Sequence, residues 1–220
     1  YTNTDNPKFL DAAFKHYRAQ CIDEKIIAEF IRFHPFNNFP IVHSDYLDFN
    51  IYDREVVVLE LEKDFFAHYP AKVRNTVKRA REKLEIRKSK QLEKFISMYT
   101  ETMIKNQASE FYFFDKNYFE QLFLLSELYE VIYAGDIIAM GFFMFSGDFA
   151  HYHLSANTES SYSMNANYAL LNELFNVAKQ AGKKYFILGG GTTTELKDPL
   201  LRFKQKFSKT TTPFYIAGNI

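Results

Sequence analysis

The chain has 220 residues, of which 47% are hydrophobic and 25% are charged, a balance that is typical of a folded globular protein and excludes global disorder. Because 27 Lys and Arg residues balance 27 Asp and Glu residues, the composition argues against a protein that coats nucleic acid through a general basic excess. Cys21 is the only cysteine, which excludes an intramolecular disulfide and a cysteine-rich zinc site.

Helical and extended patterns alternate in the first part of the chain. Asn6 and Pro7 are typical of a helix start, and the apolar spacing after them predicts a helix over residues 7–21. The elements predicted after it are strands at 25–33, 46–52 and 54–61, a helix at 64–83 that is interrupted at Pro70, a strand at 84–89, and helices at 91–107 and 115–128.

The second part of the chain begins with hairpin signals. Gly135-Asp136 and Gly147-Asp148 lie between apolar runs and predict an antiparallel meander. Its middle run, IIAMGFFMF, is apolar at both alternating positions, which predicts a central strand that is covered on both faces. The predicted elements are strands at 129–134, 137–146 and 149–156, a helix at 165–181, a strand at 183–191, a helix at 196–208 and a strand at 213–218. This mixed order predicts an α+β (α/β/α) fold rather than a doubly wound sheet.

Four stretches resemble the FemAB-like group of acyltransferases, which are built from GNAT folds. They are VRNTVKRAREKLEIR (73–87), SEFYFFDKNYFEQL (109–122), IYAGDIIAMGFFMFSGDFAHYHLSA (132–156) and YFILGGGTTTELKDPLLRFKQKFS (185–208). The last is the most specific, since it combines a strand, glycines, a variable loop, Asp-Pro-Leu and Phe-Lys-x-x-Phe. The resemblance implies a GNAT-like mixed, mainly antiparallel sheet that is flanked by helices.

The resemblance also implies a domain organisation. The segment AEFIRFHPFNN, residues 28–38, is similar to the linker region that follows the first lobe in this group. We therefore expect residues 1–50 to be the tail of a preceding GNAT-like lobe or a linker, and residues 51–220 to be a FemAB-like GNAT acyltransferase domain. Because the sequence shows neither a signal peptide nor an apolar run that spans a bilayer, we expect a cytoplasmic location without membrane insertion.

The function that the resemblance implies is N-acyl transfer. An acetyl or aminoacyl group would move to an amino group of a cell-envelope sugar or a peptidoglycan-type precursor, by direct attack in a ternary complex. Residues 160–167, SSYSMNAN, stand where ordinary GNATs have the loop Q/R-x-x-G-x-G/A. Two donors therefore stay open, acyl-coenzyme A and aminoacyl-tRNA. The expected partners are a small-molecule or nucleotide- or lipid-linked amine and tRNA, and no metal is expected.

By the same resemblance, residues 149–156 form the strand that splays from its neighbour in GNAT folds. Strict alternation would place Tyr152 and Leu154 on one face and the two histidines on the other. His151 is a candidate catalytic base, with His153 as the alternative, because imidazole titrates near neutral pH. Tyr152 is expected to line the substrate groove. Structural packing is the competing interpretation for all three.

The terminal helix supplies a second group of candidates. The buried face of this helix is formed by Phe203 and Phe207, and Lys204 falls beside it, near the end of the glycine strand. A lysine here would hold a phosphate or stabilise developing charge, although on spacing alone a solvated amphipathic helix is an equal alternative. The resemblance favours a catalytic role for Lys204, and Lys206 is a candidate for substrate binding. Glycines at 189 and 190 permit close approach of a ligand, or form a tight turn only.

The remaining residues are candidates for substrate binding, most of them toward anionic groups. They are Arg32, Arg74, Lys78, Tyr112, Asn165 and Asn167. Positive charge on the helix at 64–83 suits phosphates, although charge runs on helices are also common solvated faces. The two asparagines stand at a predicted helix N-terminus, which is a natural anion site, although capping explains one of them.

Two other classes of function compete with catalysis. A non-catalytic RNA- or anion-binding module would use the basic helix, although the zero net charge argues against it. The chain would otherwise be the incomplete half of a larger transferase whose chemistry lies elsewhere.

Overall fold

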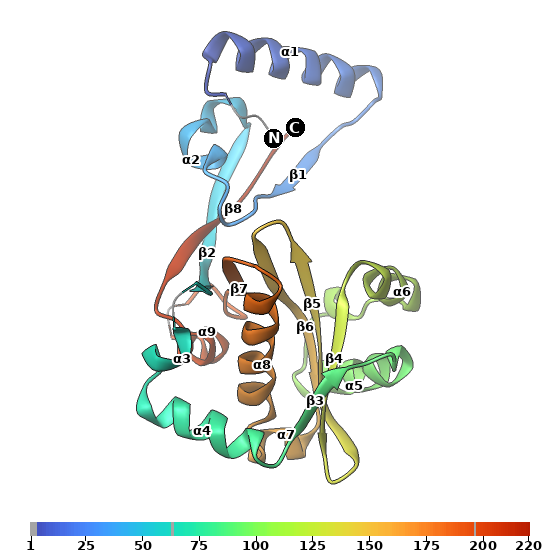
Figure 1. Cartoon of the computed structure of the whole chain (residues 1–220). Coiled ribbons are helices and arrows are strands. Elements are labelled where there is room, and N and C mark those ends of the chain that lie inside the picture. The colour runs from blue at the N-terminus through green and yellow to red at the C-terminus, as the bar shows by residue number, and fades with distance from the viewer. Residues whose placement is uncertain (1–3, 63, 196) are drawn as a thin grey trace. The chain divides into compact units, whose positions relative to one another are not determined.

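A computed structural model of the chain describes residues 4–62, 64–195 and 197–220, and the chain divides into two compact units. The first unit consists of Tyr1–Glu55 and Thr212–Ile220, and the second of Val56–Thr211 (Figure 1). The boundary that we predict at residue 50 differs from this division, because the chain changes unit after Glu55 and returns to the first unit at Thr212. The origin of the first unit as the tail of a preceding lobe stays a prediction.

The first unit combines one long helix with three strands. Helix α1 (Pro7–Asp23) starts where predicted, because the Asn6 side chain accepts a hydrogen bond from Lys8 N at 3.1 Å and Pro7 begins the first turn. The strands β1 (Glu29–Arg32), β8 (Thr211–Asn219) and β2 (Phe49–Glu60) lie in the order β1-β8-β2. Two short helices, α2 (Phe39–Val42) and η1 (Ser44–Tyr46), connect β1 to β2.

The sheet of the second unit is mainly antiparallel. It comprises the end of β2, β7 (Tyr185–Gly189), β6 (Phe149–Asn157), β5 (Asp136–Ser146), β4 (Glu127–Tyr133) and β3 (Glu85–Lys88), in that spatial order. Strands β4, β5 and β6 form the predicted meander, and Gly135 and Gly147 supply the positive φ angles, 91° and 50°, at its two turns. Among the described strand pairs of this sheet, β2–β7, β3–β4, β4–β5 and β5–β6 are antiparallel, and β6–β7 is parallel.

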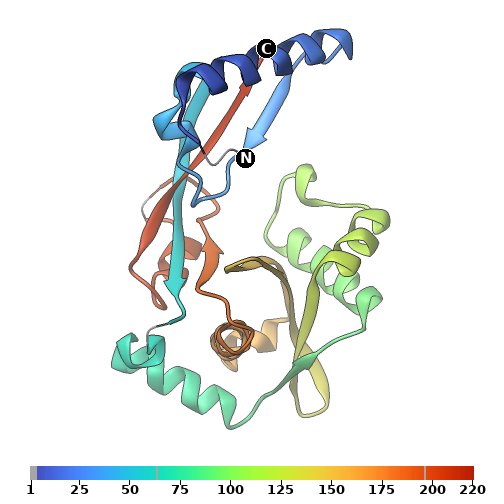
Figure 2. The same ribbon diagram turned by 45° about the horizontal axis from the view of Figure 1, so that its top comes forward.

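Helices cover both faces of this sheet (Figure 2). They are α3 (Phe65–His68), α4 (Ala71–Arg81), α5 (Leu92–Lys105), η2 (Glu110–Tyr112), α6 (Lys116–Leu125), α7 (Glu159–Ser163), α8 (Ala166–Gln180) and α9 (Pro199–Lys204). One core forms beneath α4 and α8, and the other beneath α5 and α6. Phe142 and Phe143, adjacent on β5, enter opposite cores, which confirms that this central strand is covered on both faces.

Three predicted elements differ from the structure. The strand predicted at 25–33 is confined to β1, because α1 ends in a turn in which Lys25 has φ 58° and Ile26 N donates to Cys21 O at 2.8 Å. The strands predicted on either side of Asp53 are one continuous strand, β2. The helix predicted at 196–208 is shorter, since α9 begins at Pro199; its predicted first residue, Leu196, lies outside the described residues.

Candidate active site

Strands β6 and β7 pair at one end only. Pairing between β6 and β5 extends from Phe149 to Asn157, whereas the parallel pairing between β6 and β7 covers only residues 149–151 and 185–187. Beyond His151 and Ile187, the ladder between these two strands stops. The edge of β6 from Tyr152 onward therefore presents backbone groups that β7 does not engage, at the place where a GNAT-like sheet is expected to splay.

A β-bulge lies directly after this point. Phe142 is opposite Leu154, but Phe143 is opposite Tyr152, so His153 is the extra residue on β6. Tyr152 consequently packs in the α8 core, with its ring stacked on that of Phe143 at 5.3 Å, whereas Leu154 packs in the α5 core. The expectation that Tyr152 and Leu154 share a face is wrong, because the bulge shifts the alternation by one residue.

Tyr152 is a partly buried phenol beside the separation of the strands. Burial raises its pKa to about 12, although a hydrogen bond with Ser155 acts in the opposite direction. The hydroxyl therefore stays protonated at neutral pH and is able to donate a hydrogen bond. Its role in lining a substrate groove stays a prediction.

The two histidines of β6 have different surroundings. His153 Nε2 lies 2.8 Å from the hydroxyl oxygen of Tyr118 on α6, and burial lowers the pKa of His153. The ring of His151 lies 5.9 Å from that of His153, on the stretch of β6 that still pairs with β7. The structure therefore gives His153, the alternative candidate, a defined polar partner. The catalytic role predicted for His151 stays a prediction.

The glycine run ends β7 and is held by two buried charged side chains. Gly189 has φ 80°, in the region that favours glycine. Lys204 is only 7% exposed, and its Nζ donates to the carbonyl oxygen of Gly190 at 2.7 Å. Asp198 is only 3% exposed and accepts hydrogen bonds from the backbone N–H groups of Thr192 and Thr193 at 3.0 and 2.9 Å. Lys204 thus reaches the end of β7, as its spacing suggested, from a buried position.

The N-terminus of α8 follows β6 through α7. Asn165 precedes the helix at φ 55° and its side chain makes no capping hydrogen bond. Within the described residues, the buried Asn167 Oδ1 has no hydrogen-bond partner. An uncapped helix start with a buried polar atom beside it fits a phosphate-bearing donor, although the loop lacks the glycines of ordinary GNATs.

The other predicted binding residues are dispersed over the second unit. Lys78 is exposed on α4, and Tyr112 is exposed on η2, where its carbonyl accepts a hydrogen bond from Tyr99 at 3.0 Å. Lys206 is exposed and donates to the Tyr168 hydroxyl at 2.8 Å. Their substrate-binding roles stay predictions, since none of these three side chains reaches the open edge of β6 through a contact that the structure shows.

Arg74 has a structural use. Its guanidinium donates to the backbone carbonyls of Ala67, at 3.1 Å, and of Tyr69, and so binds the end of α3 to α4. We expect Arg74→Ala to lower the free energy of unfolding by about 1.5 kcal/mol, because two charge-assisted hydrogen bonds are lost. Thermal denaturation should show the loss as a fall of about 3–6 °C. The exposed Lys78→Ala on the same helix should stay within about 0.5 kcal/mol of the native chain; equal effects of the two variants would contradict this interpretation.

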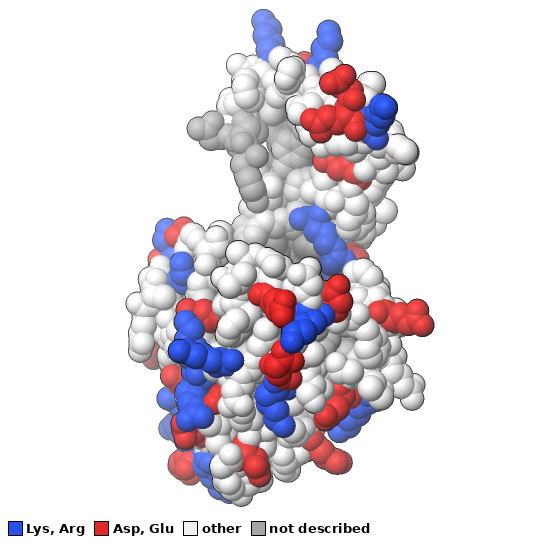
Figure 3. All heavy atoms as spheres, turned by 90° about the vertical axis from the view of Figure 1, so that its right-hand side faces the viewer, with Lys and Arg blue, Asp and Glu red and all other residues white. Residues whose placement is uncertain are grey.

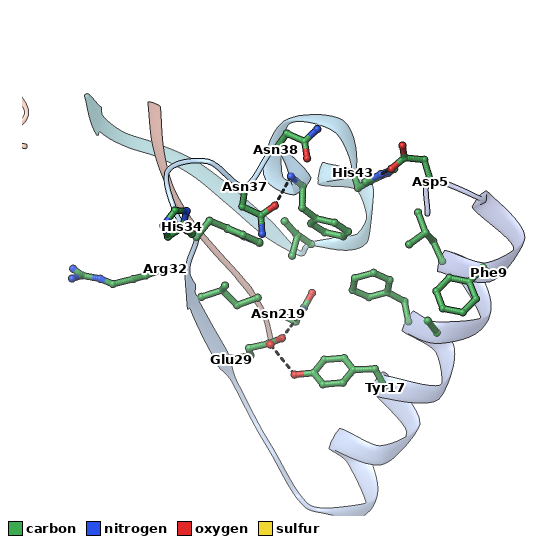
Figure 4. A pocket seen from close by; sticks show the side chains of 17 residues that line it. Asp5, Phe9, Tyr17, Glu29, Arg32, His34, Asn37, Asn38, His43 and Asn219 are labelled. Atoms are coloured by element: carbon green, nitrogen blue, oxygen red, sulfur yellow. Dashed lines mark hydrogen bonds and ion pairs between the residues drawn. The ribbon is translucent and has the colours of Figure 1, made fainter. Parts of the chain in front are cut away.

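Arg32 belongs to the first unit, which holds a pocket of its own. The pocket has a volume of about 660 Å³ and is lined by polar and apolar side chains of α1, β1, α2 and their connections, including the aromatic rings of Phe9, Phe14, Tyr17 and Phe39. Figure 4 shows Tyr17 and Asn219 meeting the Glu29 carboxylate inside it, at 2.7 and 2.6 Å, whereas Arg32 points away. The anion-binding role of Arg32 stays a prediction.

Within residues 4–62, 64–195 and 197–220, no three His, Cys, Asp or Glu side chains are grouped closely enough to hold a metal ion. Among the helices in that part of the chain, none has the length and apolar character needed to cross a membrane.

The comparisons with known proteins agree with this geometry. Residues 71–205, which cover most of the second unit, match the family model described as an acetyltransferase (GNAT) domain. The chain belongs to the GNAT acetyltransferase family. It is therefore an acyltransferase. No curated protein sequence matches it.

Solved structures similar to this GNAT chain include three with related names. FemX shares 13% identity and a TM-score of 0.78, over 96% of this chain and 77% of that one. L-PGS from Bacillus licheniformis shares 15% identity and a TM-score of 0.69, over 93% and 72%. The C-terminal domain of an Agrobacterium fabrum protein named as a lysylphosphatidylglycerol synthetase shares 17% identity and a TM-score of 0.65, over 97% and 74%. At these identities the likeness shows the fold, and it confirms the FemAB-like architecture that the sequence predicts.

Proposed function

We propose that the chain is an N-acyltransferase that moves an acetyl or aminoacyl group onto an amino group of a cell-envelope sugar or a peptidoglycan-type precursor. The observation that carries this proposal is the end of pairing between β6 and β7 after His151 and Ile187. Oriented backbone N–H groups on such an open edge suit the oxygen of an acyl carbonyl, which gains negative charge as the amine attacks. Names of the structural neighbours FemX and lysylphosphatidylglycerol synthetase support a substrate of the cell envelope.

Direct attack in a ternary complex is the mechanism that the residues favour. Cys21, the only cysteine in the sequence, lies on α1 of the first unit. The polar groups on the open part of β6 include the Tyr152 phenol, with Ser155 as its hydrogen-bond partner, and the His153 imidazole; the phenol and the imidazole suit proton transfer and hydrogen bonding more than acyl storage. Holding the amine and the acyl group together would then supply much of the rate enhancement.

The donor is either acyl-coenzyme A, which membership of the GNAT family favours, or aminoacyl-tRNA, which the FemAB resemblance implies. Both carry phosphates, and the uncapped start of α8 with Asn165 and Asn167 is the place we propose for them. Both donors are made in the cytoplasm, so we propose that the reaction takes place there.

The test is a transfer assay on the whole chain. Labelled acetyl-coenzyme A and a mixture of charged tRNAs are each combined with an amino-sugar nucleotide, a muropeptide precursor and an aminolipid, and the products are identified by mass spectrometry. We expect one donor to give an amide with one acceptor class. If the native chain transfers no group from either donor, the proposal fails and the alternative of an incomplete half of a larger transferase is favoured.

A binding module for RNA is the competing function. On the face shown in Figure 3, basic and acidic side chains are interspersed. In the second unit, the ion pairs Lys116–Glu93 and Lys88–Glu127 lie at 2.5 and 2.8 Å. On the basic helix α4, Arg81 pairs with Glu173 at 2.8 Å. These contacts favour catalysis over a phosphate-binding surface. Strong tRNA binding that falls steeply with salt, without any transfer, would reverse this preference.

A further inference from the structure

A histidine and a tyrosine from different elements meet beside the open edge of β6. His153 is the extra residue of the bulge, one position beyond Tyr152, the first residue of β6 that β7 no longer pairs with. Bulges commonly redirect a side chain next to an active site. Its Nε2 lies 2.8 Å from the Tyr118 hydroxyl. Since the sequence pattern of β6 gives no sign of the bulge, this pair is visible only in the structure.

Tyr118 is fixed from two sides. Its backbone N–H donates to the Asp115 side chain at 2.8 Å at the start of α6, and its ring stacks on Phe114 with 4.2 Å between ring centroids. Immediately before this stack, the side chains of Phe111 and Phe113 are exposed. A fixed hydroxyl next to exposed aromatic rings suits the binding of the acyl-acceptor substrate, which must be held in place while its amine reacts.

The protonation states of the pair suit the passage of a proton. Burial lowers the pKa of His153 and raises the pKa of Tyr118, so the imidazole is neutral and the phenol is protonated at neutral pH. The titratable side chains near them are Tyr99 of α5, whose pKa burial raises to about 12, His151 of the same strand, and Asp115, which accepts from the Tyr118 backbone N–H. With its proton on Nδ1, His153 accepts the Tyr118 hydroxyl hydrogen at Nε2.

We propose that Tyr118 and His153 form the proton relay that deprotonates the attacking amine. This inference rests on the proposed function and assigns its base. As the amine nitrogen forms its bond to the acyl carbon, the bond from that carbon to the sulfur or oxygen of the donor breaks. The proton lost by the nitrogen passes to Tyr118, whose own proton moves to His153. The leaving atom takes a proton from water, and the hydroxide that remains takes the proton from His153, which restores the neutral imidazole. Tyr118 is the catalytic residue, and His153 is the positioning residue and base behind it.

Two variants test the relay in the full chain. Tyr118→Phe removes the hydroxyl, and His153→Gln keeps a hydrogen-bond acceptor for Tyr118 but takes up no proton near neutral pH. We expect each variant to lower kcat by about 10- to 100-fold, because general base catalysis is lost, with KM unchanged within about twofold. In the native chain kcat should fall as the pH drops through the lowered pKa of His153, since the imidazole then becomes protonated; His153→Gln should not show this acid limb.

Matched controls separate the possible results. Tyr133→Phe at the exposed end of β4 and His16→Gln on the exposed surface of α1 should keep the native kcat. If the native chain transfers acyl groups and Tyr118→Phe or His153→Gln keeps its kcat and its acid limb, the relay is overturned and the proposed function stands. If a variant loses activity through a raised KM or a lowered melting temperature, the pair is structural and the relay is also overturned. If the native chain transfers nothing, the proposed function itself has failed.

Discussion

Replacing Asp198 with alanine should lower the free energy of unfolding by about 3 kcal/mol, because four hydrogen bonds to a buried charged acceptor are lost. The carboxylate accepts from the backbone of Thr192, Thr193 and Leu201 at 3.0, 2.9 and 2.9 Å, and from the Thr193 hydroxyl at 3.2 Å. The carboxylate therefore fixes the residues that directly follow the glycine run and caps the N-terminus of α9 at the same time. Urea denaturation should report the loss as a lower transition midpoint at an unchanged slope.

The same carboxylate predicts a dependence on pH. Burial acts to raise the pKa of Asp198, but hydrogen bonds from Leu201, Thr193 and Leu200 outweigh it, and the pKa lies below its ordinary value. Because the folded pKa is below the unfolded value of about 3.9, this stabilisation is present at neutral pH and is lost as the pH falls below that value. Thr194→Ala, exposed on the same loop, is the control. An Asp198→Ala chain as stable as this control would contradict the prediction.

Replacing Lys204 with methionine should lower kcat/KM by about 100-fold, the effect expected when one preorganised donor or charge at a reacting centre is removed. The Lys204 Nζ lies at the end of β7, 2.7 Å from Gly190 O, beyond the last residue that pairs with β6. Methionine keeps an unbranched side chain of similar length in the buried site, so most of the packing is retained. Steady-state kinetics of the acyl transfer would measure the change.

A structural role of Lys204 would give a different result. Arg202→Met, on an exposed position of α9, removes a positive charge without touching the glycine run and should leave kcat/KM within about twofold. If Lys204→Met lowers the melting temperature but keeps kcat/KM, the lysine serves to hold the Gly190 carbonyl, and its catalytic role is contradicted.

Local signals in the sequence predicted most of the helices and strands of the second unit. Gly135 and Gly147 mark the turns of the meander, because the conformation of a tight turn depends on the residues within the turn itself. The same is true of α1, where Asn6 and Pro7 act within one turn. Both cases depend on contacts between residues that are close in the chain.

The candidate site was harder to predict because it depends on contacts between distant residues. Alternation along β6 placed Tyr152 and Leu154 on one face, whereas the bulge at His153 separates them. Tyr118 lies 35 positions before His153 and had no signal beyond its aromatic neighbours. For Asp198, a signal was present, because an aspartate before Pro199 is a typical helix start, and its burial under the glycine loop is what sequence alone does not show.

The path of the chain through the two units sets an order for folding. The middle strand of the first unit, β8, is supplied by the segment that follows the whole of the second unit. Since domains generally fold as units during synthesis, the second unit is able to fold on the ribosome while β1 and β2 still lack the strand that joins them. The apolar side chains that later pack against β8, including Phe33 and Leu47, stay exposed for that interval, which makes this step the one most open to misassociation between chains.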